Sequence, residues 1–206
     1  MFTPGIGAHA KALFRLLPAD VRSFAIIGGG ALRCFFDKTP MADIDLLFRN
    51  EEAFQAAIKA FSETPGHYFI KHKGRSEVWG QTGSNVEFNL IGFCFGTAQE
   101  TIERFDFRCC RMAAFYNENC GMEFVSDPHA VSDAVTKSLI VLVNNGTERT
   151  LMRIAHYVDD YGYVLDLDVD EHLVAEPEPD EESAELPPTR VSTYISRLPR
   201  CGSGGY

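Results

Sequence analysis

The residues best suited to chemistry are two aspartates in the first quarter of the chain. Asp43 and Asp45 stand two positions apart in the run DIDLLF. In a strand, positions i and i+2 project from the same face, so the two carboxylates are expected side by side. Such a pair on a strand with buried neighbours is costly without a cation. The pair therefore predicts a divalent metal site, and Mg²⁺ suits oxygen ligands completed by substrate phosphates and water.

Three successive glycines, Gly28, Gly29 and Gly30, end the apolar run that precedes the aspartates. Glycines between a strand and a helix let the backbone approach a ligand, and the first amides of the helix face any anion held there. The segment has neither the Lys-Ser/Thr of a P-loop nor the GxGxxG of a dinucleotide fold. A glycine run alone usually means a tight turn. Beside the two carboxylates, it predicts a cradle for a nucleoside triphosphate (NTP) with magnesium.

Hydrophobic periodicity predicts the elements that position these residues. Apolar side chains at helical spacing predict helices at residues 8–17, 31–36, 51–61 and 97–104. Short apolar or alternating runs predict strands at residues 21–27, 43–48, 67–72, 77–81 and 86–93. The mixture of both element types indicates an α/β (α+β) fold.

The last of these strands places Glu87 and Asn89 on one face. If it neighbours the Asp43 strand, Glu87 becomes a third carboxylate at the metal site. Glu87 could then complete the metal shell or accept a proton from the attacking hydroxyl. The alternative is a polar position on a half-exposed strand.

Residues 21–163 resemble the head domain of class II tRNA nucleotidyltransferases and bacterial poly(A) polymerases. The family signature of two glycines, two residues, Arg-Asp, a spacer and Asp-x-Asp is matched by Gly29, Gly30, Arg33, Asp43 and Asp45. Cys34 stands where the family has the Asp of Arg-Asp.

Two later segments continue the resemblance in the same order. The first resembles the family's RRDFTINALAYD segment: Arg104, Asp106 and Phe107 match, while Arg108 and Cys110 replace Thr and Asn. The second resembles the helix LRAVRFAARLGF; its matching residues are Arg153, Tyr157, Gly162 and Tyr163, with His156 in place of the second Arg.

The resemblance implies a polymerase-β-like nucleotidyltransferase head with a small mixed sheet flanked by helices. We expect the head at residues 1–125, a helical extension packed on it at 126–163, and an acidic, disordered tail at 164–206. The implied reaction moves a nucleoside monophosphate from an NTP to a hydroxyl acceptor and releases pyrophosphate. Two Mg²⁺ ions held by Asp43 and Asp45 would assist it.

The nucleotide pocket implied by the resemblance consists of glycines and charged residues: Gly28, Gly29, Gly30, Arg33, Arg104, Asp106 and Arg153. Purely structural roles stay open as alternatives for the charged residues. Arg33 could cover its own helix, Arg104 and Asp106 could form a local ion pair, and Arg153 could be a helix-surface charge. The acceptor could be an RNA or tRNA end, a protein hydroxyl or a small molecule, and the family's EDxxR base-reading motif is missing.

Two rival functions share some of these features. A nucleotide- or partner-binding module that has lost its chemistry is favoured by the departures at Cys34, Arg108, Cys110 and His156, but the intact Asp-x-Asp argues against it. A metal hydrolase without a nucleotide substrate would need histidine and carboxylate clusters that the sequence lacks.

The composition bounds the partners and the compartment. The net charge is −10, of which residues 164–206 contribute −7 through ten acidic and three basic residues. That acidic, proline-containing stretch predicts disorder, with a short docking segment at 191–198. The sequence contains no dense basic patch of the kind that binds a long nucleic acid through many phosphates. Any contact with RNA should therefore be small.

The apolar runs are all shorter than the ~20 residues that span a bilayer, and the N-terminus lacks a signal-peptide layout. Six cysteines without zinc or CxxC spacing predict reduced thiols. We therefore expect a cytoplasmic protein with no membrane association. The oligomeric state stays open.

Overall fold

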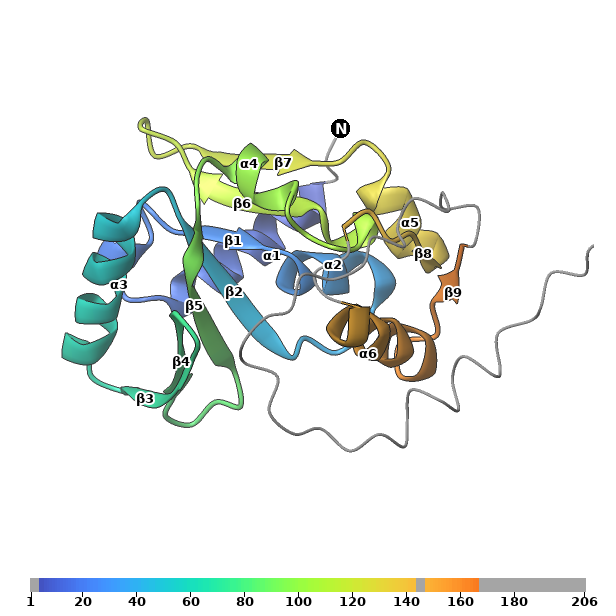
Figure 1. Cartoon of the computed structure of the whole chain (residues 1–206). Helices are drawn as coiled ribbons and strands as arrows, with labels where there is room; N and C mark the ends of the chain where they lie inside the picture. Colours follow the sequence, from blue (N-terminus) through green and yellow to red (C-terminus); the bar gives the residue numbers. More distant parts are fainter. Residues whose placement is uncertain (1–3, 144–146, 167–206) are drawn as a thin grey trace, which may run out of the picture.

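A single mixed sheet organises residues 4–143 and 147–166, which the computed structural model describes. Its seven strands are β1 (Ile26–Gly28), β2 (Asp43–Phe48), β3 (His67–Lys73), β4 (Ser76–Gln81), β5 (Glu87–Phe95), β6 (Met112–Tyr116) and β7 (Met122–Ser126). Their order across the sheet is β3-β4-β5-β2-β1-β6-β7 (Figure 1). Strands β2 and β5 are parallel and the other neighbours are antiparallel. The predicted mixed sheet is confirmed.

Six helices accompany this sheet within the described residues. They are α1 (Pro4–Leu16), α2 (Gly30–Asp37), α3 (Glu51–Glu63), α4 (Ala98–Ile102), α5 (Ala130–Thr136) and α6 (Thr147–Asp159). Two 3-10 turns, η1 (Ala19–Val21) and η2 (Arg108–Cys110), and a small parallel pair, β8 (Ser138–Leu139) with β9 (Val164–Leu165), complete the fold.

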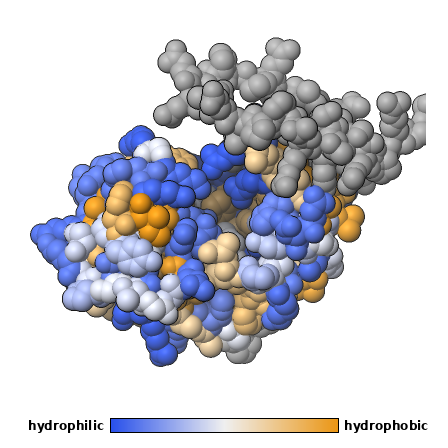
Figure 2. Space-filling view, turned by 90° about the horizontal axis from the view of Figure 1, so that it is seen from below, coloured by the Kyte–Doolittle hydropathy of each residue, from blue (hydrophilic) through white to orange (hydrophobic). Residues whose placement is uncertain are grey.

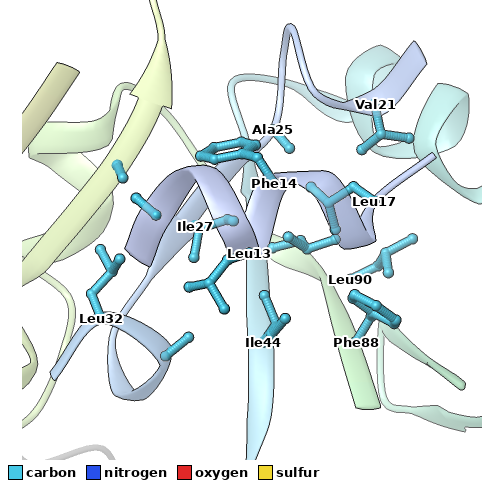
Figure 3. Close-up of a cluster of buried hydrophobic side chains, with 14 of the residues drawn as sticks. Leu13, Phe14, Leu17, Val21, Ala25, Ile27, Leu32, Ile44, Phe88 and Leu90 are labelled. Carbon is cyan, nitrogen blue, oxygen red and sulfur yellow. The ribbon is translucent and has the colours of Figure 1, made fainter. Parts of the chain in front are cut away.

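The main core fills the space between α1, α2, α3 and one face of the sheet (Figure 3). Strand β2 contributes Ile44 and Leu46 to this face, both fully buried. Because side chains alternate along a strand, Asp43, Asp45 and Leu47 lie on the opposite face. There Leu47 packs with residues of α4 in a smaller cluster. The alternation of β2 thus separates the main core from the acidic pair.

The first strand is shorter than the sequence predicts. Residues 19–21 form η1 instead, and Arg22 holds this turn by donating from Nε and Nη2 to the Leu17 carbonyl at 3.1 and 2.9 Å. The strand prediction is wrong for residues 21–25, because the backbone amides of Phe24 and Ala25 donate to the Val21 carbonyl at 3.2 and 3.0 Å and not to a neighbouring strand.

One short strand lies within the predicted tail. Val164 and Leu165 form β9, so the first residues assigned to the tail belong to the described structure. Residues 167–206, including the predicted docking segment at 191–198, lie outside the described residues. The division into head, extension and tail stays a prediction. No helix within 4–143 or 147–166 is both long enough and apolar enough to cross a membrane.

Replacement of Phe88 tests the core. Its fully buried ring packs against Phe61 and His67, with centroids 5.4 and 5.8 Å apart. We expect Phe88→Ala to lower the free energy of unfolding by about 3–5 kcal/mol, because it removes buried surface and leaves a cavity. Urea denaturation measures this. Phe93→Ala is the matched control, since Phe93 on the same strand is 57% exposed and its loss should cost under ~1 kcal/mol. Equal losses in both variants would contradict the assigned core.

Candidate functional site

The two aspartates meet at one side-chain amide. Strand β5 runs parallel to β2 with Asn89 opposite Asp45. The Asn89 Nδ2 group donates to Asp43 Oδ2 at 2.6 Å and to Asp45 Oδ1 at 3.1 Å. The structure therefore brings the two carboxylates together, as their spacing predicts. Strand alternation predicts the face on which Asn89 lies, but the sequence does not indicate that Asn89 contacts both aspartates.

The glycine turn lies directly beside Asp45. Gly28 is its antiparallel partner in β1, and a Cβ at Gly29 would lie 3.7 Å from Asp45 Oδ2. Gly29 has φ +67°, which side-chain-bearing residues rarely adopt, and it precedes the first residue of α2. The unpaired amides at the start of α2 therefore lie next to the acidic pair. A phosphate-binding role for this turn and a metal at the two aspartates stay predictions.

The close placement of Asp43 and Asp45 changes the pKa of one of them. Burial, followed by the charge of Asp43, raises the pKa of Asp45 to about 6. The hydrogen bond from Asn89 and the charges of Arg153 and Lys73 act in the opposite direction but do not cancel the shift. Ionised together at neutral pH, the two carboxylates repel each other at a cost that a bound cation would remove.

The chemistry of the site fits Mg²⁺. Within residues 4–143 and 147–166, no three His, Cys, Asp or Glu side chains converge as a metal cage. Magnesium does not need one, because it commonly takes one or two carboxylates and completes its shell with substrate phosphates and water. Asp43 and Asp45 would supply those two carboxylates.

Helix α6 brings a cation to the same region. Arg153 Nε lies 3.2 Å from Asp106 Oδ2, and its guanidinium sits 5.3 Å from the Phe107 ring centroid. Asp106 is 1% exposed, and burial raises its pKa while the Arg153 charge lowers it. The Arg153 side chain stays 41% exposed and interacts electrostatically with Asp45. Asp106 thus holds Arg153 at the edge of the acidic pair.

Three further residues of the predicted site have different surroundings. Glu87 is the register partner of Asp43, lies on the same face of the sheet as the two aspartates (the site face), and is exposed. Gly30 opens α2 with free space where a Cβ would lie. Arg104 is exposed and donates to Cys94 Sγ at 3.4 Å, so it does not form the alternative local pair with Asp106. Nucleotide or catalytic roles for these residues stay predictions.

Arg33 is buried between α2 and the C-terminal part of the chain. It is 3% exposed, pairs with Asp37 one turn later, and its guanidinium lies 4.8 Å from the ring centroids of Tyr157 and Tyr161. The hydroxyl of Tyr163 donates to Asp37 Oδ2 at 2.7 Å. A contact between Arg33 and a triphosphate would require release from this cluster.

Two residues that differ from the family pattern, Arg108 and Cys110, contact helices α5 and α6. Arg108 donates from Nε and Nη2 to the two carboxylate oxygens of Asp133 at 2.6 and 3.0 Å. Cys110 Sγ lies 2.9 Å from the Tyr157 hydroxyl in the buried cluster under α6. These substitutions therefore connect the head to the C-terminal helices.

Comparison with family models decides the family. A model described as Gabija anti-defense 2 family protein matches residues 9–137, more than half of the chain. The chain belongs to the Gabija anti-defense 2 family. A search of the curated proteins by sequence found no match.

Solved structures show that this family member has the fold of a CCA-adding enzyme head. The Thermotoga maritima CCA-adding enzyme complexed with tRNA is similar with a TM-score of 0.57 and 20% identity, over 80% of this chain and 40% of that one. A CCA-adding enzyme complexed with ATP gives 0.56 and 19%, over 76% and 40%. The Bacillus stearothermophilus enzyme with CTP gives 0.54 and 16%, over 81% and 42%. The chain spans about two fifths of these enzymes' length. The resemblance in fold is confirmed.

Removing one charge of the acidic pair should stabilise the metal-free family member. The folded-state pKa of Asp45, about 6, exceeds the ordinary value of ~3.9 in an unfolded chain. Stability therefore falls as pH rises through this window and stays lowered above it. We expect Asp45→Asn to raise the free energy of unfolding on the order of 1–2 kcal/mol at pH 8 and to have little effect near pH 4.

Urea denaturation in the presence of EDTA at both pH values checks this expectation. Asp20→Asn is the matched control, because Asp20 is exposed and its replacement should change stability by under ~0.5 kcal/mol. A destabilising effect of Asp45→Asn at pH 8 would contradict the proposed repulsion.

The buried cluster around Arg33 gives a second expectation. Arg33→Met leaves the Asp37 carboxylate, whose side chain is fully buried, without its cation. The loss of stability should be about 3 kcal/mol. Arg33→Met/Asp37→Asn should recover much of it, since the amide removes the uncompensated charge, its oxygen can accept from Thr39, and its NH2 group can donate to the Tyr163 hydroxyl oxygen. Unchanged stability of Arg33→Met together with weaker NTP binding would instead assign Arg33 to the nucleotide.

Proposed function

We propose that the protein is a magnesium-dependent nucleotidyltransferase that moves a nucleoside monophosphate from an NTP to a hydroxyl acceptor and releases pyrophosphate. The observation that carries this proposal is the close placement of Asp43, Asp45 and Gly29. Both carboxylates accept from one side-chain amide, and they lie beside the glycine turn at which α2 begins. The likeness in fold to CCA-adding enzymes solved with ATP and with CTP supports it.

The residues present divide the work of the reaction. Asp43 and Asp45 would hold Mg²⁺, which supplies positive charge to the α-phosphate and to the entering and leaving oxygens. The amides after Gly29 bind the triphosphate, and Arg153, oriented by Asp106, neutralises the departing pyrophosphate. These groups are fixed before substrate binds, because each belongs to a helix, a strand or an ion pair of the fold.

Proton transfer needs a base on the acceptor side. As the acceptor oxygen bonds to the α-phosphorus, the bond to the pyrophosphate oxygen breaks and the acceptor hydroxyl loses its proton. Glu87 is the exposed carboxylate in register with Asp43, and it takes this proton directly or through water. Arg104 is a further contact for the nucleotide if a phosphate extends toward β5.

The family description supplies the biological setting. The product of the transfer would counteract a defence called Gabija. The titles of the similar enzymes name ATP, CTP and tRNA, so an NTP donor and an RNA or tRNA end are the first substrates to test. A protein hydroxyl or a small molecule is the alternative acceptor. We place the activity in the cytoplasm.

A binding module without chemistry is the second candidate. The burial of Arg33 in an aromatic cluster favours it, because the signature arginine is then not directed at a triphosphate. The substitutions at Cys34, Arg108, Cys110 and His156 point the same way. Such a module would bind NTP and a partner through the same cradle.

Transfer of label separates the two candidates. The purified protein is incubated with each α-labelled NTP, Mg²⁺ and total cellular RNA, and labelled RNA and labelled protein are resolved. We expect label transfer by the native chain and a loss of roughly 100-fold or more in Asp43→Asn and in Asp45→Asn. Asp20→Asn is the control that keeps its activity. Magnesium-dependent NTP binding without any transfer would favour the binding module.

A further inference from the structure

A row of side chains leads from the acidic pair to the free edge of the sheet. The pairing of β2, β5, β4 and β3 aligns Asp43 with Glu87, Gly80 and Tyr68. The next row aligns Asp45 with Asn89, Val78 and Lys71. Residues paired directly across a sheet share a face, so both rows lie on the face that carries the aspartates.

Tyr68 forms an aromatic platform in the first row. A Cβ at Gly80 would lie 2.5 Å from Tyr68 Cζ, so the ring covers the space that glycine leaves open on β4. The side chain is nevertheless 49% exposed. Strand β3 lies at the left of the molecule, and the left part of the view from below shows hydrophobic side chains among hydrophilic ones (Figure 2). An exposed ring of this kind can stack with a base.

Two lysines add positive charge to the same edge. Lys71 and Lys73 of β3 are exposed and two positions apart, so they project to one side of the strand. The charge of Lys73 acts on Asp45, which agrees with its position on the site face. The face is therefore cationic at β3 and anionic at β2 and β5, where Glu87 lies beside Asp43.

This polarity selects one class of ligand. An acceptor lying along the face needs an anionic body over the lysines and an uncharged hydroxyl end at the aspartates. A polynucleotide end has this arrangement, since phosphates precede a neutral terminal sugar. Tyr68 and Asp43 are separated by three strand spacings, about 14 Å, which is more than one nucleotide covers.

We propose that Tyr68, Lys71 and Lys73 form the acceptor subsite and bind the end of a single-stranded nucleic acid, with its terminal hydroxyl directed at Asp43 and Asp45. The inference rests on the proposed nucleotidyl transfer and names the surface and the class of its acceptor. Arg153 and the glycine turn then serve the NTP on the other side of the aspartates.

Binding without catalysis tests the subsite independently of the transfer reaction. Fluorescence anisotropy follows fluorescein-labelled single-stranded RNA and DNA of about 12 nucleotides, with mixed sequence, and a glutamate-rich peptide of similar charge. Lys71→Ala/Lys73→Ala should weaken nucleic-acid binding about 10- to 30-fold and reduce the salt slope by about 1.4. Tyr68→Ala should weaken it by at least about 5-fold, while Tyr68→Phe keeps most of the affinity.

Lys11→Ala is the matched control, since Lys11 is an exposed lysine of α1, on the helix-covered side of the sheet. Equal affinity of the control and the lysine variants, or no binding by the native chain, would overturn the subsite. Equal dependence of peptide binding on the lysines and Tyr68 would overturn its assignment to nucleic acid. Binding of an NTP with Mg²⁺ is measured in parallel: if it persists when nucleic-acid binding fails, the acceptor subsite is wrong and the NTP site stands.

Discussion

The structure depends on an electrostatic constraint: two carboxylates held side by side at the centre of a sheet. Their strand satisfies it by alternation, because Ile44 and Leu46 enter the main core while Asp43 and Asp45 face away from it. A slip of one residue would bury both charges, so the hydrophobic pattern that fixes the register also fixes the site. Asn89 then bridges the two carboxylates. Neighbouring features, including the glycine turn and Arg153, are arranged around this concentration of negative charge.

A second polar cluster joins the head to its C-terminal part. Arg33 and Asp37 of α2 are enclosed by tyrosines from α6 and the turn that follows it. A buried ion pair is weak evidence of stability in itself, but it specifies one arrangement, because either partner alone would be an uncompensated charge. By fixing α6, the cluster also fixes Arg153 beside Asp45. A signature arginine that the resemblance assigns to the nucleotide therefore supports the site through the fold.

Much of this architecture could be predicted from sequence because its determinants are local. Periodicity gave β2 with its observed limits, and the Asp-x-Asp spacing placed two carboxylates together. Contacts between distant segments were not predictable in this way. The Asn89 bridge requires the parallel pairing of β2 with β5, and the burial of Arg33 requires tyrosines more than a hundred residues later. The position of Lys73 on the same face as the aspartates likewise follows from strand order, which a single sequence does not state.

The most direct test of the account is the magnesium dependence of NTP binding. Calorimetric titration with non-hydrolysable analogues of ATP and CTP, with Mg²⁺ or EDTA, compares the native chain with Asp43→Asn/Asp45→Asn. We predict that Mg²⁺ tightens NTP binding to the native chain roughly tenfold or more, about 1.4 kcal/mol, and leaves the NTP affinity of the variant unchanged. The same enhancement by Mg²⁺ in both proteins would contradict it, because the aspartates would then not hold the cation that joins the protein to the triphosphate.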